Sequence, residues 1–167
     1  MKPCLTVLAA LLLCAAGCAT YTWTSTVPQE KRCIAVPMFE NDSGTPEIDA
    51  LLTQYTLREF QREGTFKIGR LGKAPLKLIG RVIRTDLKSI VFDRNFGSRT
   101  AEYEYTLVAE ITLVEVSTGK LLIDGQKVKA KTTFLTRGDM LTGMQDAGPR
   151  ISKELARSIV DAVLAYW

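Results

Sequence analysis

The stretch Glu102-Tyr103-Glu104-Tyr105-Thr106-Leu107-Val108-Ala109-Glu110-Ile111-Thr112-Leu113 decides the fold of this chain. Its odd positions are apolar, and most of its even positions are polar. A β-strand turns successive side chains to opposite faces, so a period of two predicts a strand with one buried and one solvated face. We therefore expect a sheet whose apolar face is covered by other elements of the chain.

The next residues predict a hairpin. Ser117-Thr118-Gly119-Lys120 is typical of a tight turn, and the strand after it is expected to extend to about Leu135. In one register apolar residues lie opposite apolar residues and an acidic residue lies opposite a basic one. A shift by one residue would break both kinds of pair. Gly125 is a position where this register would accommodate a bulge. The predicted pairs are Ser117 with Lys120, Glu110 with Lys127, Ala109 with Val128, Leu107 with Ala130 and Tyr103 with Phe134.

Three lysines, Lys127, Lys129 and Lys131, fall on the polar face of that strand. One interpretation is a solvated stripe that balances Glu104 and Glu110, because exposed ion pairs are common and weak. The other is a surface that binds an anionic partner. The residues alone leave both open.

Two further strands are expected upstream. Residues 76–83 have the apolar content of a strand that could continue through a bend to Ile90-Val91-Phe92, and residues 93–100 then read as a loop. Residues 34–39 form a short apolar run typical of a buried strand. Pro37 in that run has no backbone N–H to donate, which indicates an edge position or a bulge.

Two helices complete the expected order. The first is predicted over 46–63, with Thr45 as N-cap, Pro46 in the first turn and Gly64 as its stop. The second is predicted over 149–166, after a loop at 137–148. The order β-α-β-β-β-α predicts a two-layer α+β fold, in which two helices pack on one face of a four-stranded mixed or antiparallel sheet.

The N-terminal residues carry an export signal. Leu11-Leu12-Leu13-Cys14-Ala15-Ala16-Gly17-Cys18 follows a short apolar segment and resembles a bacterial lipobox. Residues 1–17 would then be a removed signal peptide, residues 18–30 a lipidated cysteine with a tether, and residues 31–167 a single domain. Acylation of Cys18 would hold the domain at a membrane without a spanning helix. An ordinary secretory peptide or an uncleaved anchor is the alternative.

Composition excludes several classes of function. The chain has 22 basic and 18 acidic residues and no histidine, so the commonest general base and metal ligand is missing. No nucleotide-binding loop or paired-cysteine metal motif occurs, and we expect no enzyme activity, no metal and no cofactor. Cys33 is the one thiol left after processing, and we expect a small half-buried side chain rather than a reactive group. Export also argues against a nucleic-acid partner.

Short motifs in one order resemble the LptE family of lipopolysaccharide-assembly lipoproteins, over nearly the whole mature chain. They are Ile34-Ala35-Val36-Pro37-Met38-Phe39-Glu40-Asn41, Leu51-Leu52-Thr53, Arg58-Glu59-Phe60, Leu78-Ile79-Gly80-Arg81-Val82, Thr118-Gly119-Lys120-Leu121-Leu122, and the segment from Leu155-Ala156 to Trp167.

The resemblance implies a partner and a ligand. LptE-like lipoproteins sit within the lumen of the outer-membrane barrel LptD, help it to mature and deliver lipopolysaccharide to the cell surface. Phosphate-bearing lipid A would need Arg or Lys at the contact. The candidate residues in this chain are Arg81, Arg84, Lys88, Arg94 and Arg99, followed by Lys127, Lys129 and Lys131.

Two other functions remain open at this stage. A regulator or secretion-pore lipoprotein of the LpoB or CsgG type also begins with an Ile-Ala-Val strand followed by Phe and Asn. A lipoprotein enzyme would need a cleft with convergent carboxylates, which the sequence does not indicate. Ala19 after Cys18 is not the acidic residue of inner-membrane retention, so the outer membrane is the expected location.

Overall fold

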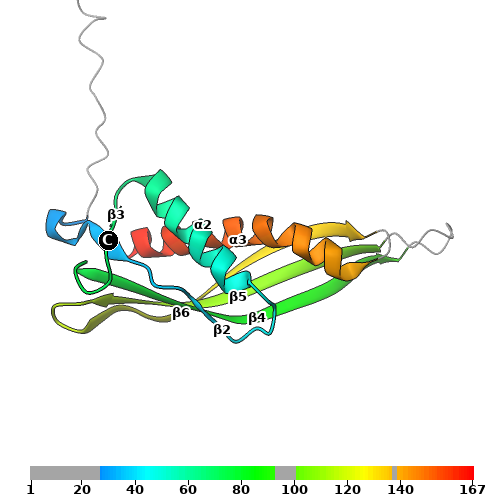
Figure 1. Ribbon diagram of the computed structural model, residues 1–167, viewed down its shortest axis with the longest axis horizontal. Coiled ribbons are helices and arrows are strands. Elements are labelled where there is room, and N and C mark those ends of the chain that lie inside the picture. The colour runs from blue at the N-terminus through cyan, green and yellow to red at the C-terminus, as the bar shows by residue number, and fades with distance from the viewer. Residues whose placement is uncertain (1–26, 93–100, 137–138) are drawn as a thin grey trace, which may run out of the picture.

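The computed structural model describes residues 27–92, 101–136 and 139–167 as a sheet with two helices on one of its faces (Figure 1). The elements in chain order are the 3-10 turn η1 (Gln29–Lys31), β1 (Cys33–Ala35), β2 (Glu40–Asn41), α2 (Ile48–Glu63), β3 (Lys67–Ile68), β4 (Leu76–Phe92), β5 (Ala101–Glu115), β6 (Lys120–Thr136) and α3 (Met140–Ala165).

Within the described residues the sheet is mixed and has six strands, not the expected four. Its order is β3-β1-β4-β5-β6, and β2 also pairs with β4. The long strands β4, β5 and β6 are antiparallel neighbours, whereas the short β1, β2 and β3 run parallel to the strands they contact. The extra strands have two or three residues each, which is too short for a hydrophobic period to indicate them.

Pro37 divides the expected strand at 34–39 into β1 and β2. Both pieces pair with β4, through Ile34 opposite Leu76 and Glu40 opposite Arg81. The expectation of an edge position is wrong, because β1 lies between β3 and β4. The chain leaves the sheet after Ala35 and returns to it at Glu40, and Pro37, which has no backbone N–H to donate, lies between the two strands.

The apolar face of β5 forms the floor of the core. The odd residues from Tyr105 to Leu113 are each at most 1% exposed, so the predicted one-face-buried strand is confirmed. Helix α3 packs over β5 and β6 and beside α2. The α3 side chains buried there are Ala147, Ile151, Ser152, Leu155, Ala156, Ile159, Val160 and Val163.

The predicted hairpin register is confirmed over most of its length and wrong at the turn. Ala109 lies opposite Val128 and Tyr103 opposite Phe134, as expected. Nearer the turn the register shifts twice, and Lys120 pairs with Glu115 instead of Ser117. Part of the shift lies at Gly125, whose φ of 59° few other residues adopt and whose N–H bonds Thr112 Oγ1 at 3.2 Å.

Both helices begin elsewhere than expected. Helix α2 starts at Ile48 after Glu47, which has a φ of 61°; the predicted cap Thr45 bonds the hydroxyl of Thr85 instead, at 2.8 Å. Gly64 ends α2 in the left-handed conformation, as predicted. The expected loop at 137–148 is wrong from residue 140 onward.

Asp139 explains the early start of α3. Its carboxylate accepts the N–H of Leu141 at 3.0 Å and the hydroxyl of Thr142 at 2.8 Å and so caps the helix. These bonds, with that from Thr142 the larger, lower the pKa of Asp139. Pro149 lies inside the helix, where one missing hydrogen bond is offset by packing against α2 and the sheet.

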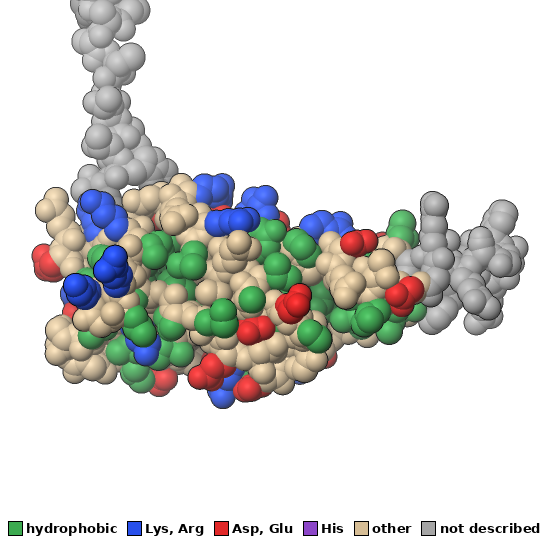
Figure 2. Space-filling view, in the orientation of Figure 1, with side chains coloured by type: hydrophobic (Ala, Val, Ile, Leu, Met, Phe, Trp, Pro, Cys, Tyr) green, Lys and Arg blue, Asp and Glu red, His purple; other side chains and the backbone are tan. Residues whose placement is uncertain are grey.

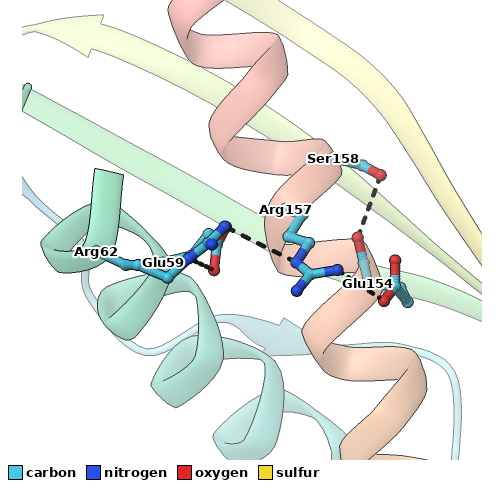
Figure 3. A network of polar contacts seen from close by, with 5 residues as sticks. All are labelled: Glu59, Arg62, Glu154, Arg157 and Ser158. Carbon is cyan, nitrogen blue, oxygen red and sulfur yellow. Dashed lines mark hydrogen bonds and ion pairs between the residues drawn. The ribbon is translucent and has the colours of Figure 1, made fainter. Parts of the chain in front are cut away.

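A polar network joins the two helices (Figure 3). Glu59 of α2 is only 8% exposed. Its carboxylate accepts both Nε and Nη2 of Arg62, and Arg157 Nε of α3 lies 3.9 Å from it. Arg157 also contacts Glu154 at 3.1 Å. Two guanidinium groups thus compensate one carboxylate that is largely removed from water.

Two glycines differ in the room that their surroundings leave for a side chain. A Cβ on Gly80 of β4 would lie 2.6 Å from the ring of Phe39, whereas a Cβ on Gly148 of α3 would lie 3.6 Å from Leu51. Phe39 is 2% exposed, and its N–H bonds Thr53 Oγ1 at 3.0 Å. The missing side chain at Gly80 therefore leaves room for Phe39, which packs the β1–β2 connection against the sheet.

Alanine substitutions at these two glycines should act in opposite directions. Gly80→Ala overpacks the site around Phe39 and should lower the free energy of unfolding by about 1–3 kcal/mol. Gly148→Ala removes a helix-interior glycine with room for a methyl group and should raise it by about 0.5–1 kcal/mol. Urea unfolding of both variants measures the difference. Equal destabilisation by the two changes would contradict this packing.

Candidate functional site

The face of β4, β5 and β6 that points away from the helices, here called the outward face, carries most of the predicted basic residues. Among the described residues neither helix packs on it. Arg94, Arg99 and Cys18 lie outside the described residues. The basic residues that the structure brings together on this face are Arg81, Arg84, Lys88, Lys127, Lys129 and Lys131.

A bulge in β4 puts the arginines on one face. Arg81 and Arg84 are three residues apart, a spacing that would turn them to opposite faces of a regular strand. The register with β5 shifts between Val82 and Arg84, so Arg81 lies opposite Glu110 and Arg84 lies opposite Val108. From Arg84 onward, Asp86 and Lys88 follow on the same face.

Across the face, the basic residues flank a central line of acidic ones. One row runs from Arg81 through Glu110 to Lys127, and the next from Arg84 through Val108 to Lys129. Neighbouring strands lie about 4.8 Å apart, so the two basic lines are separated by about 10 Å. The six cations outnumber the four carboxylates that lie alongside them on these strands, which are Glu102, Glu104 and Glu110 on β5 and Asp86 on β4.

Half of these cations are held in ion pairs. Arg81 contacts Glu110 at 2.8 Å and Asp42 at 3.5 Å, while Arg84 contacts Asp86 and Lys131 contacts Glu104, both at 2.8 Å. The hydrogen bond that Arg81 donates to Glu110 raises the pKa of Arg81, and the bond that Lys131 donates to Glu104 lowers the pKa of Glu104.

The other half are available to a ligand. Among the described residues, Lys88, Lys127 and Lys129 make no ion pair within 4 Å, and all three are exposed. Half-buried Ile79 and Val114 lie on the same face. Free ammonium groups beside apolar side chains suit an amphipathic anion or a partner surface of mixed character.

A cavity of about 520 Å³ opens on the helix side, at the far end of the sheet from β1. Sequence reasoning missed it, because it forms where the unexpected first turns of α3 meet the start of α2. Tyr105 lines it, and burial raises the pKa of that hydroxyl, partly offset by a hydrogen bond with Thr45. The main side chains around it are Ile48, Leu51, Tyr105, Leu141, Met144 and Gln145.

The carboxylates that pair with the basic residues were also missed in part. The hairpin register predicts Glu104 and Glu110 near the lysines, but Asp42 and Asp86 reach the arginines only through β2 and the β4 bulge. Within the described ranges, no group of three potential metal-ligating side chains occurs.

Comparison with known protein families decides the identity of the domain. The model of the family LptE, described as lipopolysaccharide-assembly, matches residues 32–163. The chain belongs to the LptE family. LptE proteins are non-enzymatic lipoproteins of the cell envelope that act in lipopolysaccharide assembly, so this chain is an envelope lipoprotein. No protein of curated function matches the chain by sequence.

Two solved structures share the fold at low sequence identity, and a third is similar at a lower TM-score. A putative lipoprotein from Caulobacter crescentus has a TM-score of 0.52 and 16% identity, covering 77% of this chain and 89% of its own. A hypothetical protein from Chlamydia trachomatis has 0.50 and 9%, covering 81% and 97%. Rare lipoprotein B from Shewanella oneidensis has 0.46 and 17%, covering 80% and 94%. In this LptE chain, neither described helix is both long and apolar enough to cross a membrane.

The contact with Lys131 lowers the pKa of Glu104, and we predict that one substitution restores the ordinary pKa. Lys131→Ser removes the bond that lowers the pKa of Glu104, so that pKa should rise toward its ordinary value of 4.5. Since the folded-state pKa is lowered, the contact stabilises the fold above the unfolded-state pKa and loses this effect as pH falls through the folded-state value. NMR titration of the Glu104 carboxyl measures the shift.

Lys129→Ser is the matched control, because Lys129 lies opposite Val108 and contacts no carboxylate among the described residues. It should leave the Glu104 titration unchanged. An equal rise of the Glu104 pKa in both variants would mean that the combined charge of Lys127, Lys129 and Lys131, not the Lys131 contact, lowers this pKa.

Proposed function

We propose that this LptE chain is an outer-membrane lipoprotein, anchored through acylated Cys18, whose domain lies in the lumen of an LptD-like barrel. There it assists maturation of the barrel and delivery of lipopolysaccharide to the cell surface. The observation that carries the proposal is the family match over residues 32–163. The lipobox resemblance at Cys18 supports the anchor.

The outward face is the surface we assign to the barrel. The helix layer needs no partner to bury its apolar residues, because the buried face of α3 already packs against α2 and the sheet. The outward face instead combines ion pairs with half-buried Ile79, Val108 and Val114 and has no cover among the described elements. Such a mixture resembles the surface of a non-obligate interface more than that of a domain core.

Lipopolysaccharide is the ligand we assign to the basic lines of the same face. Phosphate groups accept charge-assisted hydrogen bonds from Lys and Arg. Lys88, Lys127 and Lys129 can make such contacts without giving up an ion pair, whereas Arg81, Arg84 and Lys131 must exchange one. Because exposed ion pairs contribute at most about 1 kcal/mol, this exchange costs little.

Site-specific photo-crosslinking tests the barrel partner. A photoreactive amino acid at Val108, on the outward face, should crosslink the native lipoprotein in outer membranes to a large barrel. The same group at Lys153, exposed on α3, is the control and should crosslink less. Recovery of no barrel from either position would refute the partner. A ladder of crosslinked copies of this chain would favour the ring-forming alternative.

Charge removal tests the ligand. Lys127→Ser with Lys129→Ser should weaken binding of the full lipoprotein to purified lipopolysaccharide by about 5- to 30-fold, if each lysine contributes up to about 1 kcal/mol. Unfolding should stay cooperative, because these are surface positions. Arg150→Ser with Lys153→Ser removes the same charge from exposed sites on α3 and should bind as the parent does. Equal losses would indicate attraction by net charge alone.

A further inference from the structure

Four segments that are distant in the sequence meet at one end of the sheet, here called the basal end: residues 27–32, 64–74, 115–121 and 165–167. Lys31 Nζ lies 2.6 Å from Glu115 Oε1 and 5.6 Å from the ring centre of Trp167. The N–H of Val116 bonds the carbonyl of Pro75 at 2.8 Å. Figure 1 shows the first described residues and the C-terminus at this same end.

The positive charge of the chain is concentrated here. The four segments contain six basic residues and two acidic ones, an excess of four that equals the formal net charge of +4 of the whole chain. One of the acidic residues, Glu115, is already paired with Lys31. Figure 2 shows basic side chains gathered at this end. The basic residues are Lys31, Arg32, Lys67, Arg70, Lys73 and Lys120.

A turn places an apolar side chain at the tip of this charge cluster. The N–H of Lys73 bonds the carbonyl of Arg70 at 3.0 Å, and Gly72 has a φ of 79°, which a glycine adopts without strain. Between the two cations Leu71 is 62% exposed. More apolar surface follows at Val116, which is 45% exposed and whose N–H bonds Pro75 just after this turn.

We propose that the basal end docks on an anionic lipid surface, with Leu71 at the level of the headgroups and Arg70 and Lys73 on lipid phosphates. In a membrane interface the charged headgroups lie outside the apolar acyl chains. A leucine that protrudes between two cations matches this order, because the cations reach the headgroups while the leucine reaches toward the apolar layer. Because a turn exposes Leu71, a lipid layer that yields around this turn can take up the side chain.

The path of the chain agrees with this orientation. Val27 is buried at the basal end, and Cys18 precedes it by nine residues. Nine extended residues span at most about 32 Å, so an acylated Cys18 keeps this end, rather than the opposite one, beside the bilayer. The inference rests on the lipid anchor of the proposed function but not on the barrel.

Labelling the full lipoprotein in vesicles tests the docking. Leu71→Cys in a Cys33→Ser background carries a polarity-sensitive dye. Leu135→Cys, 66% exposed at the opposite end, is the matched control. In phosphatidylethanolamine vesicles with about a third phosphatidylglycerol, the dye at 71 should shift to the blue and be quenched at least twofold more by brominated lipid than the dye at 135. Arg70→Ser with Lys73→Ser should remove at least half of that quenching.

Equal quenching at 71 and 135, or quenching at 71 that persists unchanged in phosphatidylcholine vesicles, would overturn the docking while leaving the barrel partner untouched. A chain that fails to float with vesicles at all would overturn both the docking and the lipid anchor. Circular dichroism of each labelled variant, compared with the Cys33→Ser background, checks that it is folded.

Discussion

Strand β5 is paired along its length with β4 on one edge and β6 on the other, and one of its faces is sealed beneath α3. Because side chains alternate, a one-residue slip of either neighbour would carry its charges into the core and its apolar residues into water. The burial of Tyr105, Leu107 and Ile111 therefore determines more than the core. It determines which side chains of β4 and β6 reach the outward face.

The parts that follow from this alternation could be predicted from the sequence. The pairing of Ala109 with Val128, the burial of the odd residues of β5 and the lysine stripe on the polar face all depend on matching two patterns of period two. The register near the turn could not be predicted, because bulges cost little and a single Gly125 does not say how many residues are inserted. The same holds for β4, where only the pairing shows that Arg81 and Arg84 share a face.

The parts that depend on tertiary context were mispredicted. The helical stretch 140–149 contains Gly143, Gly148 and Pro149, which predict a loop by local preference, yet the Asp139 cap and the contact with α2 outweigh that preference. Thr45 could cap α2 but bonds Thr85, forty residues away. Of the candidate site, the basic residues were identifiable from the sequence, whereas their carboxylate partners and the cavity beside Tyr105 depend on elements that no local pattern indicates.

The ion pairs of the outward face explain how one surface can be soluble and still bind. An open sheet face with unpaired cations alone would repel itself, and one with apolar residues alone would aggregate. Glu104 and Glu110 on the central strand hold Lys131 and Arg81 in weak, exposed contacts, which a phosphate or a partner carboxylate can replace at small cost. The network around buried Glu59 could not exchange partners in this way, because loss of Arg62, which donates both close hydrogen bonds, would leave a largely desolvated carboxylate. The burial of Glu59 in the helix layer and the partial exposure of Glu104 and Glu110 on the sheet thus separate the part of the domain that must stay fixed from the part that can change partners.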